Sequence, residues 1–390
     1  MRVEAMARRG LVILMILCLT TGCWDRREMD DLALVVATGI DLTDDGQIEM
    51  TYQVALPTGI PSAVKTGGGA QKPVVVISNK GRDIQEANDR LQEQMSRFIY
   101  FGHREVFIIG EKCARHGLNQ IQDLLTRFPE NRYNCFVLTA YGATAKEILN
   151  VPYQLELIPG LGISKLQSSR SSFSVKSDEL FEAFSSPGIS PVTAAIRVLN
   201  KDTDKESFAV DHAAVYLGDQ LTGFLKPDEL ELLRWWIDDP YRIGFTVQAQ
   251  PEDKQYKGTI SVKSLKSSVK VKTVIKNELP QVTASFSTLV RVVTNNSRID
   301  LNNPQDRILV EKLFSKQVQG RIESMLGYVQ KKLKSDIFGI GEEVHIEHPY
   351  IWKKIMNKWS DIFPDVPVTV KVDLTIEQIG KTLGRSHIRK

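Results

Sequence analysis

Residues 281–293 read QVTASFSTLVRVV, a stretch in which apolar or small residues recur at every second position. Successive side chains of a strand point to opposite faces, so this alternation predicts a β-strand with one buried and one solvated face. Residues 259–275 show the same alternation of apolar and polar residues, and one short turn separates them from residues 281–293. The two stretches predict antiparallel strands, and in the second of them one face is formed by Val282, Ala284, Phe286, Thr288, Val290 and Val292.

A long helix is predicted directly after this strand pair. Asn303-Pro304 is a typical helix start, because an N-cap residue is followed by proline at the first helical position. Over residues 310–333, apolar side chains recur at intervals of three or four, which gives a helix one continuous apolar face. A short helix near residues 350–359 and a strand at 366–376 complete this part of the chain. We therefore expect a C-terminal α+β domain in which an antiparallel sheet packs against a long helix.

The first half of the chain mixes strand and helix patterns, which predicts a mixed α/β fold. Strand patterns fall at residues 32–36, 48–56, 74–77, 106–109 and 134–140, and helical stripes at 84–98 and 111–128. Residues 152–191 are rich in Ser, Gly and Pro, so we expect a less regular stretch with exposed loop. The predicted units are a signal peptide at 1–22, an N-terminal mixed α/β domain at 23–197, a small middle α/β domain at 198–255 and the C-terminal α+β domain at 256–390.

The N-terminus has the three parts of a secretory signal. Arg2, Arg8 and Arg9 precede an apolar run of nine residues, 11–19, which leads to Cys23. As a helix this run would be roughly 14 Å long, about half of the ~30 Å hydrocarbon core of a bilayer, so it cannot serve as a span. A small residue before a cysteine resembles the bacterial lipobox, although Thr20 stands where that motif usually has Leu. We expect diacylglycerol on Cys23 to anchor the mature chain; plain secretion and a retained anchor are the alternatives.

Charge and size limit the classes of function. Removing residues 1–22 takes 3 of the 50 Lys and Arg and 1 of the 47 Asp and Glu, which leaves 47 against 46. A nearly neutral mature chain gives no electrostatic reason to expect nucleic-acid binding. The remaining length exceeds what one hydrophobic core usually organises, so two or three domains are expected.

The residues capable of metal or thiol chemistry are few and scattered. Cys113 and Cys135 are predicted to be small core residues, with a disulfide as the alternative in an oxidising compartment. His345 and His348 are three residues apart beside several Glu residues, but the local spacing fixes no third zinc ligand. Trp235-Trp236 and the pair Trp352 and Trp359 are expected to be buried aromatic anchors. We therefore predict no catalytic residue, no metal and no cofactor, and Cys23 is the only residue to which we assign a chemical role.

Several blocks of the sequence, in order, resemble the Ger(x)C family, the lipoprotein C subunits of bacterial spore germinant receptors. The N-terminal blocks are Gly22 to Glu28, Gly39-Ile40-Asp41, Phe101-Gly102-His103, Ile108 to Glu111 and Leu125 to Arg132. The later blocks are Ala214-Val215-Tyr216, Leu221 to Leu225, Asp336 to Gly341, Pro349 to Trp352, Trp359 and Phe363-Pro364. The resemblance extends from Cys23 to about Gly380, which is essentially the whole mature chain.

The resemblance implies three mixed α/β domains and attachment to the outer face of the inner spore membrane. It also implies assembly with two membrane-spanning receptor subunits and a part in starting germination when nutrients are sensed. It implies no biochemical act for this subunit, and it does not say whether the subunit touches the germinant.

A lipid-anchored solute-binding protein that delivers a nutrient to a transporter is the main alternative function. Such a protein would have a cleft between two similar parallel-sheet lobes. The alternating strands and long helix of residues 259–376 favour an antiparallel α+β domain instead. A secreted hydrolase is a weaker alternative, because the sequence has no convincing catalytic triad or metal motif.

Overall fold

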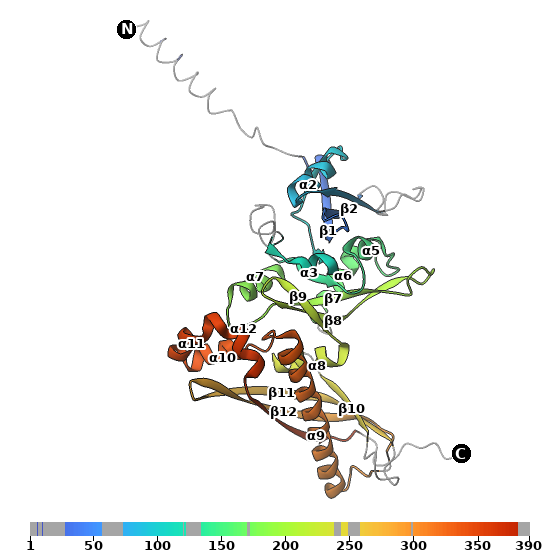
Figure 1. The fold of residues 1–390 in the computed structure, drawn as a ribbon. Helices are drawn as coiled ribbons and strands as arrows, with labels where there is room; N and C mark the ends of the chain where they lie inside the picture. The colour runs from blue at the N-terminus through green and yellow to red at the C-terminus, as the bar shows by residue number, and fades with distance from the viewer. Residues whose placement is uncertain are drawn as a thin grey trace, which may run out of the picture.

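Two β-sheets, each with its own helices, are stacked along the long axis of the molecule (Figure 1). The computed structural model describes residues 6, 10, 28–56, 73–119, 121, 134–169, 172–237, 243–248, 258–297 and 299–380. The first described element next to the sheets is the short 3-10 turn η1 (Met29–Asp31), which leads directly into the first strand.

The larger sheet has nine strands and contains the whole first half of the fold. Its order is β3-β2-β1-β5-β6-β7-β8-β9, with β4 paired to β1. Strands β1, β5, β6 and β7 are parallel to one another, whereas the pairs toward both edges are antiparallel. The strands are β1 (Leu32–Leu42), β2 (Ile48–Ala55), β3 (Val74–Gly81), β4 (Phe98–Tyr100), β5 (Val106–Ile109), β6 (Phe136–Ala140), β7 (Val192–Leu199), β8 (Ser207–Leu217) and β9 (Gln220–Leu225).

Helices cover both faces of this sheet, as the predicted mixed α/β fold requires. Helices α5 (Ala145–Asn150) and α6 (Pro159–Gln167) contribute to one apolar core. Helices α2 (Ile84–Glu93), α3 (Glu111–His116) and α7 (Ser177–Ser185) contribute to the other. Because both faces are covered, the central strands β5 and β6 are buried throughout.

The smaller sheet confirms the strand pair and long helix predicted for the C-terminal part. Its order is β10 (Gly244–Gln248), β11 (Thr259–Lys276), β12 (Leu279–Asn295) and β13 (Val368–Gln378). Strands β10, β11 and β12 are antiparallel, but β13 runs parallel to β12. The difference from a purely antiparallel sheet arises because a chain of helices connects β12 to β13 and returns the chain to the same end of the sheet.

That connection consists of one long helix and a cluster of short ones. Helix α9 (Pro304–Tyr328) is capped by Asn303, whose side chain accepts a hydrogen bond from the Gln305 N–H at 3.0 Å. It continues as the π-helical turn η4 (Val329–Leu333), and the predicted apolar stripe is buried from Val310 to Leu333. The short helices are α10 (Ile340–Glu347), α11 (Pro349–Ile355), η5 (Met356–Lys358), α12 (Trp359–Ile362) and η6 (Phe363–Asp365).

Helix α8 (Pro227–Trp236) follows β9 and packs between the two sheets (Figure 1). Trp235 and Trp236 are both buried, and their rings lie 5.0 and 5.3 Å from that of Phe286 on β12. The predicted role of these tryptophans as core anchors is confirmed. One apolar cluster therefore runs from the larger sheet through α8 into the smaller one. The domain boundaries at residues 197 and 255 stay a prediction, since sheet membership does not decide which units fold independently.

Three local predictions differ from the structure. The helix expected over residues 84–98 ends at Glu93, because Phe98 begins β4 and its backbone pairs with β1. The helix expected over 111–128 has its first break after His116, where Gly117 adopts a φ of 133° that ends a helical turn. The composition of residues 152–191 predicts a less regular stretch with exposed loop, but the segment includes α6 and α7; Pro159 at the first turn of α6 is the helix signal there.

Candidate functional site

The one predicted site residue, Cys23, lies outside the described residues, so its lipidation stays a prediction. Among the helices of the described part, none is long and apolar enough to cross a bilayer. The described structure contains a large cavity beside α7 and α8, and two buried carboxylates that lie in blocks of the family resemblance.

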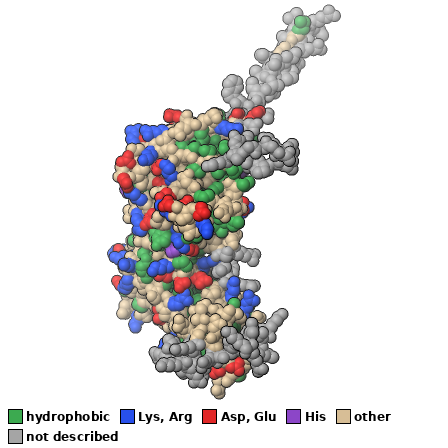
Figure 2. All heavy atoms as spheres, turned by 90° about the vertical axis from the view of Figure 1, so that its right-hand side faces the viewer, with side chains coloured by type: hydrophobic (Ala, Val, Ile, Leu, Met, Phe, Trp, Pro, Cys, Tyr) green, Lys and Arg blue, Asp and Glu red, His purple; other side chains and the backbone are tan. Residues whose placement is uncertain are grey.

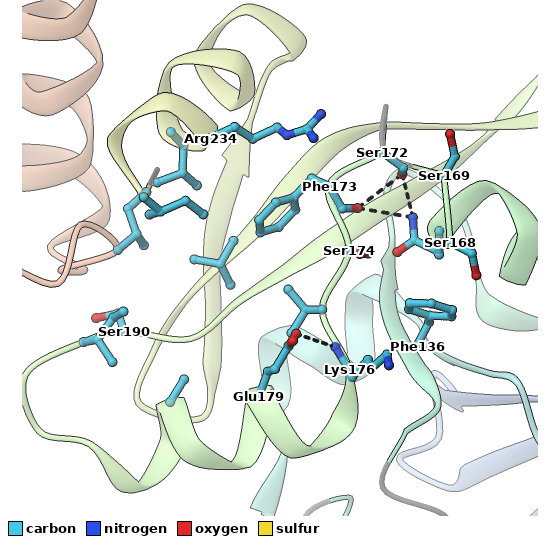
Figure 3. Close-up of a pocket in the computed structure, with 18 residues that line it drawn as sticks. Phe136, Ser168, Ser169, Ser172, Phe173, Ser174, Lys176, Glu179, Ser190 and Arg234 are labelled. Carbon is cyan, nitrogen blue, oxygen red and sulfur yellow. Dashed lines mark hydrogen bonds between the residues drawn. The ribbon is translucent and has the colours of Figure 1, made fainter. Parts of the chain in front are cut away.

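A cavity of about 1020 Å³ lies between α7, α8 and the segment that joins α6 to α7 (Figure 3). Arg234 lies on its α8 side and Ser168 on the opposite side (Figure 3). Lys176 lies above the ring of Phe136, with its ammonium nitrogen 5.9 Å from the ring centre. The cavity brings together side chains from three separate parts of the chain, which no local sequence pattern could have indicated.

The chemistry of the cavity wall suits hydrogen bonding. Buried Gln167 donates from its side-chain amide to the Ser172 hydroxyl at 2.9 Å and to the Phe173 carbonyl at 3.2 Å. Its side-chain oxygen has no hydrogen-bond partner among the described residues. Glu179 accepts a hydrogen bond from the backbone N–H of Lys176 at 2.9 Å, so this carboxylate caps the first turn of α7. The described wall contains serines but no histidine; its possible bases are Glu179, which caps α7, and Lys176, whose ammonium nitrogen lies over the Phe136 ring.

Asp41 fastens β1 to α5 in the larger sheet. Its carboxylate is buried and accepts hydrogen bonds from the backbone N–H groups of Ala145 at 2.8 Å and Lys146 at 2.9 Å. Burial raises the pKa of Asp41 to about 6, although these two hydrogen bonds oppose the rise. A Cβ on Gly110 would lie 1.9 Å from the Asp41 carboxylate, so only glycine fits there. The family blocks at residues 39–41 and 108–111 therefore meet in one structural junction.

Asp336 has a similar role in the C-terminal half. Its carboxylate is buried and accepts hydrogen bonds from the backbone N–H of Phe338 and Ile340, both at 3.2 Å. It also accepts from the N–H of Gly341 at 2.8 Å and from the Trp359 indole N–H at 2.9 Å. Burial raises the pKa of Asp336 to about 6. These bonds fix the loop before α10 against α12.

The same loop is joined to the end of α7. The Asp336 carbonyl accepts a hydrogen bond from the Ser190 N–H at 2.7 Å, and the Ser186 hydroxyl donates to Glu342 at 2.9 Å. A Cβ on Gly188 would approach the backbone N of Glu342 to 2.8 Å, so the two segments pack backbone to backbone. The block from Asp336 to Gly341 thus connects the two halves of the fold.

The scattered Cys and His residues occupy structural positions. Cys113 is buried, and desolvation raises the pKa of its thiol to about 12, which keeps it protonated. Cys113 and Cys135 are both free and buried, as expected of small core residues. The His348 ring nitrogen lies 3.1 Å from the Thr273 carbonyl, and the His345 ring stacks on Trp352 at 5.9 Å. Within the described ranges, no group of three or more His, Cys, Asp or Glu side chains could hold a metal ion.

Two models of known protein families together match nearly all of the chain from residue 25 onward. Residues 25–198 match the spore germination protein N-terminal domain, and residues 211–380 match the C-terminal domain described as spore germination B3/GerAC like. The chain belongs to the GerAC family of spore germination proteins. The resemblance inferred from the sequence blocks is therefore confirmed.

Similar proteins match this GerAC family member over almost their whole length. The protein YfkR of Bacillus subtilis (strain 168) is 30% identical, over 94% of this chain and 95% of its own. Spore germination protein KC of the same strain is 25% identical, over 95% of each chain. The crystal structure of the GerBC protein matches with a TM-score of 0.54 and 21% identity, over 87% of this chain and 96% of its own, and so supports the fold.

Proposed function

We propose that this protein is a lipid-anchored, non-enzymatic subunit of a nutrient germinant receptor at the outer face of the inner spore membrane. The observation that carries the proposal is the match of both halves of the chain, in order, to the two spore germination domains. The curated relatives that it resembles over their full length are spore germination proteins. Two membrane-spanning receptor subunits are the proposed partners, and diacylglycerol on Cys23 is the proposed membrane anchor.

The internal chemistry of the described structure agrees with a non-enzymatic role. Its two buried carboxylates with raised pKa, Asp41 and Asp336, both accept hydrogen bonds on each oxygen, Asp41 from backbone N–H groups and Asp336 from backbone N–H groups and the Trp359 indole, and they connect elements of the fold. Perturbed carboxyl groups often mark catalytic sites, but structural networks perturb the pKa in the same way. Each of these two carboxylates acts as a cap, and the Cys113 thiol is protonated within a packed core.

The solute-binding alternative is favoured by one observation, the polar cavity between α7 and α8. The surrounding architecture does not favour it, because the nine-stranded sheet and the four-stranded sheet are not two similar parallel-sheet lobes. Calorimetric titration of the purified chain with amino acids and sugars separates the two functions. A receptor subunit that acts through its partners gives no heat of binding, whereas a solute-binding protein gives micromolar affinity.

Cys23→Ala tests the proposed anchor and its role together. The expected result is loss of acyl labelling, release of the chain from the membrane fraction and loss of nutrient-triggered germination in spores that carry only this variant. The physical reason is that the apolar run of residues 11–19 is too short to hold the chain in a bilayer. Cys113→Ala serves as the matched control, because that thiol is buried and should not be acylated. An unlabelled wild-type chain, or full germination with Cys23→Ala, contradicts the proposal.

A further inference from the structure

The smaller sheet has one covered face and one exposed face, and the exposed face is strongly basic. The covered face of β12 carries Val282, Ala284, Phe286 and Val290, which pack against the helices. Side chains alternate along each strand, so the neighbouring positions point the other way. The cations of this outer face are Lys263, Lys266, Lys270, Lys272, Lys276, Arg291 and Lys371.

These seven cations lie on one face of three adjacent strands. The register pairs Lys263 with Arg291 across β11 and β12, and Ser285 of β12 lies between Lys270 and Lys371. Lys270 and Lys272 are successive outward residues of β11, roughly 7 Å apart and so within the ~8 Å over which salt screens charges, and their potentials add. One outward residue separates Lys266 from Lys270 and Lys272 from Lys276, so these cations are spaced more widely. On the neighbouring strand β13, the outward acidic residues are Asp373 and Glu377.

No ion pair within the described part of the chain includes these cations. The charge of Lys272 contributes to lowering the pKa of Glu347 on α10. Figure 2 shows a side of the molecule on which cations and acids are interspersed. The chain as a whole is close to neutral. The positive charge concentrated on this face is therefore balanced by acidic side chains in other parts of the chain.

Exposed apolar side chains lie among the cations. Val274 is 63% exposed and falls between Lys272 and Lys276, and Leu279, directly across from Lys276, is 51% exposed. Val293, near the other end of the sheet, is 56% exposed. The headgroup region of a bilayer accepts both lysine and small apolar groups, so these side chains are compatible with contact to lipid.

We infer that the outer face of β11, β12 and β13 docks on an anionic lipid surface. Six of the seven cations are lysines, which protein interfaces disfavour at their centre and which anionic bilayers attract. The face is an open sheet surface carrying Ser and Thr between the cations, so it suits a diffuse layer of phosphate headgroups. This inference does not depend on the receptor assignment, because it concerns the affinity of the folded chain for lipid.

Amine labelling of the full chain tests the inference. The chain is mixed with excess vesicles of phosphatidylglycerol or of phosphatidylcholine, acetylated briefly, and digested for mass spectrometry. Lysines 266, 270, 272 and 371 should react roughly fivefold more slowly on phosphatidylglycerol, and high salt should abolish the difference. Exposed Lys205, on the turn between β7 and β8, should react equally on both. The same digest shows whether Cys23 is acylated, so failure of the anchor and failure of docking are distinguished.

A triple variant identifies the surface. K270Q/K272Q/K276Q should weaken docking roughly 100-fold, at about fivefold for each lysine removed, and so abolish protection of Lys266 and Lys371. The variant K205Q/K316Q/K358Q removes the same charge from exposed positions off this face and should keep the protection. Equal labelling on both lipids overturns the inference. Protection that appears only when other spore membrane proteins are present also overturns it and assigns the face to an acidic protein partner.

Discussion

Asp336→Asn is the most informative single change in the described structure. One carboxylate oxygen of Asp336 accepts from the N–H groups of Phe338 and Ile340, and the other accepts from Gly341 and the Trp359 indole. Asparagine retains one oxygen and replaces the other with an NH₂ group, which cannot accept. In either orientation of the amide, two buried N–H donors therefore lose their acceptor.

The expected loss of folding stability follows from the two N–H donors that are left without an acceptor. A buried donor without an acceptor costs roughly 1–3 kcal/mol, so two of them should lower the free energy of unfolding by about 3 kcal/mol after partial relaxation. Urea unfolding followed by tryptophan fluorescence measures this difference. Asp365→Asn is the matched control, since that carboxylate is 81% exposed and pairs only with Lys331, and its loss should cost less than about 1 kcal/mol.

A loss in Asp336→Asn no larger than that in Asp365→Asn would refute the role assigned to Asp336. The same result would also weaken the explanation of the block from Asp336 to Gly341 as the junction between the two halves.

Further predictions concern Asp41, the long helix and the two halves. The pKa of Asp41 in the folded chain, about 6, lies above the ordinary value of an aspartate. The contribution of Asp41 to stability is therefore complete below that ordinary value and is lost as the pH rises through 6. The stability advantage of wild type over Asp41→Asn should grow from pH 7 to pH 5, and a difference that stays constant would contradict this prediction. Phe314→Ala should lower the free energy of unfolding by about 3–5 kcal/mol, since Phe314 is fully buried, whereas exposed Leu309→Ala on the same helix should change it by less than about 1 kcal/mol in the same urea titration. Residues 24–390 made without the signal should give mixed helix and strand circular dichroism and one cooperative transition; a random-coil spectrum would contradict independent folding.

The periodicity of apolar residues was sufficient to predict an element where one of its faces is buried and the other is exposed to solvent. The alternation in β12 and the stripe of α9 both fix a face, and Asn303 marks the helix start that the structure shows. Periodicity misled at Phe98, which continues the spacing of α2 by coincidence but pairs with β1 as part of β4. The parallel direction of β13 depends on the helical connection, and no pattern within the strand encodes it.

The candidate site was less accessible to sequence reasoning than the fold. Asp41 and Asp336 lie within the family blocks, but Asp41 accepts hydrogen bonds from a helix 104 residues away, and Asp336 bonds to the Trp359 indole 23 residues away as well as to nearby backbone N–H groups. The cavity near Arg234 is formed by segments that meet only in the folded chain. The basic outer face could not be inferred from net charge, because acidic residues elsewhere cancel it.

Affinity purification of the lipidated chain from spore membranes in mild detergent tests the central proposal most directly. The proposal predicts that two larger membrane-spanning proteins are recovered with it in constant ratio, and that Cys23→Ala lowers their recovery. Recovery of the chain without any membrane-spanning partner, together with micromolar binding of a nutrient to the purified chain, would contradict it and favour the solute-binding function.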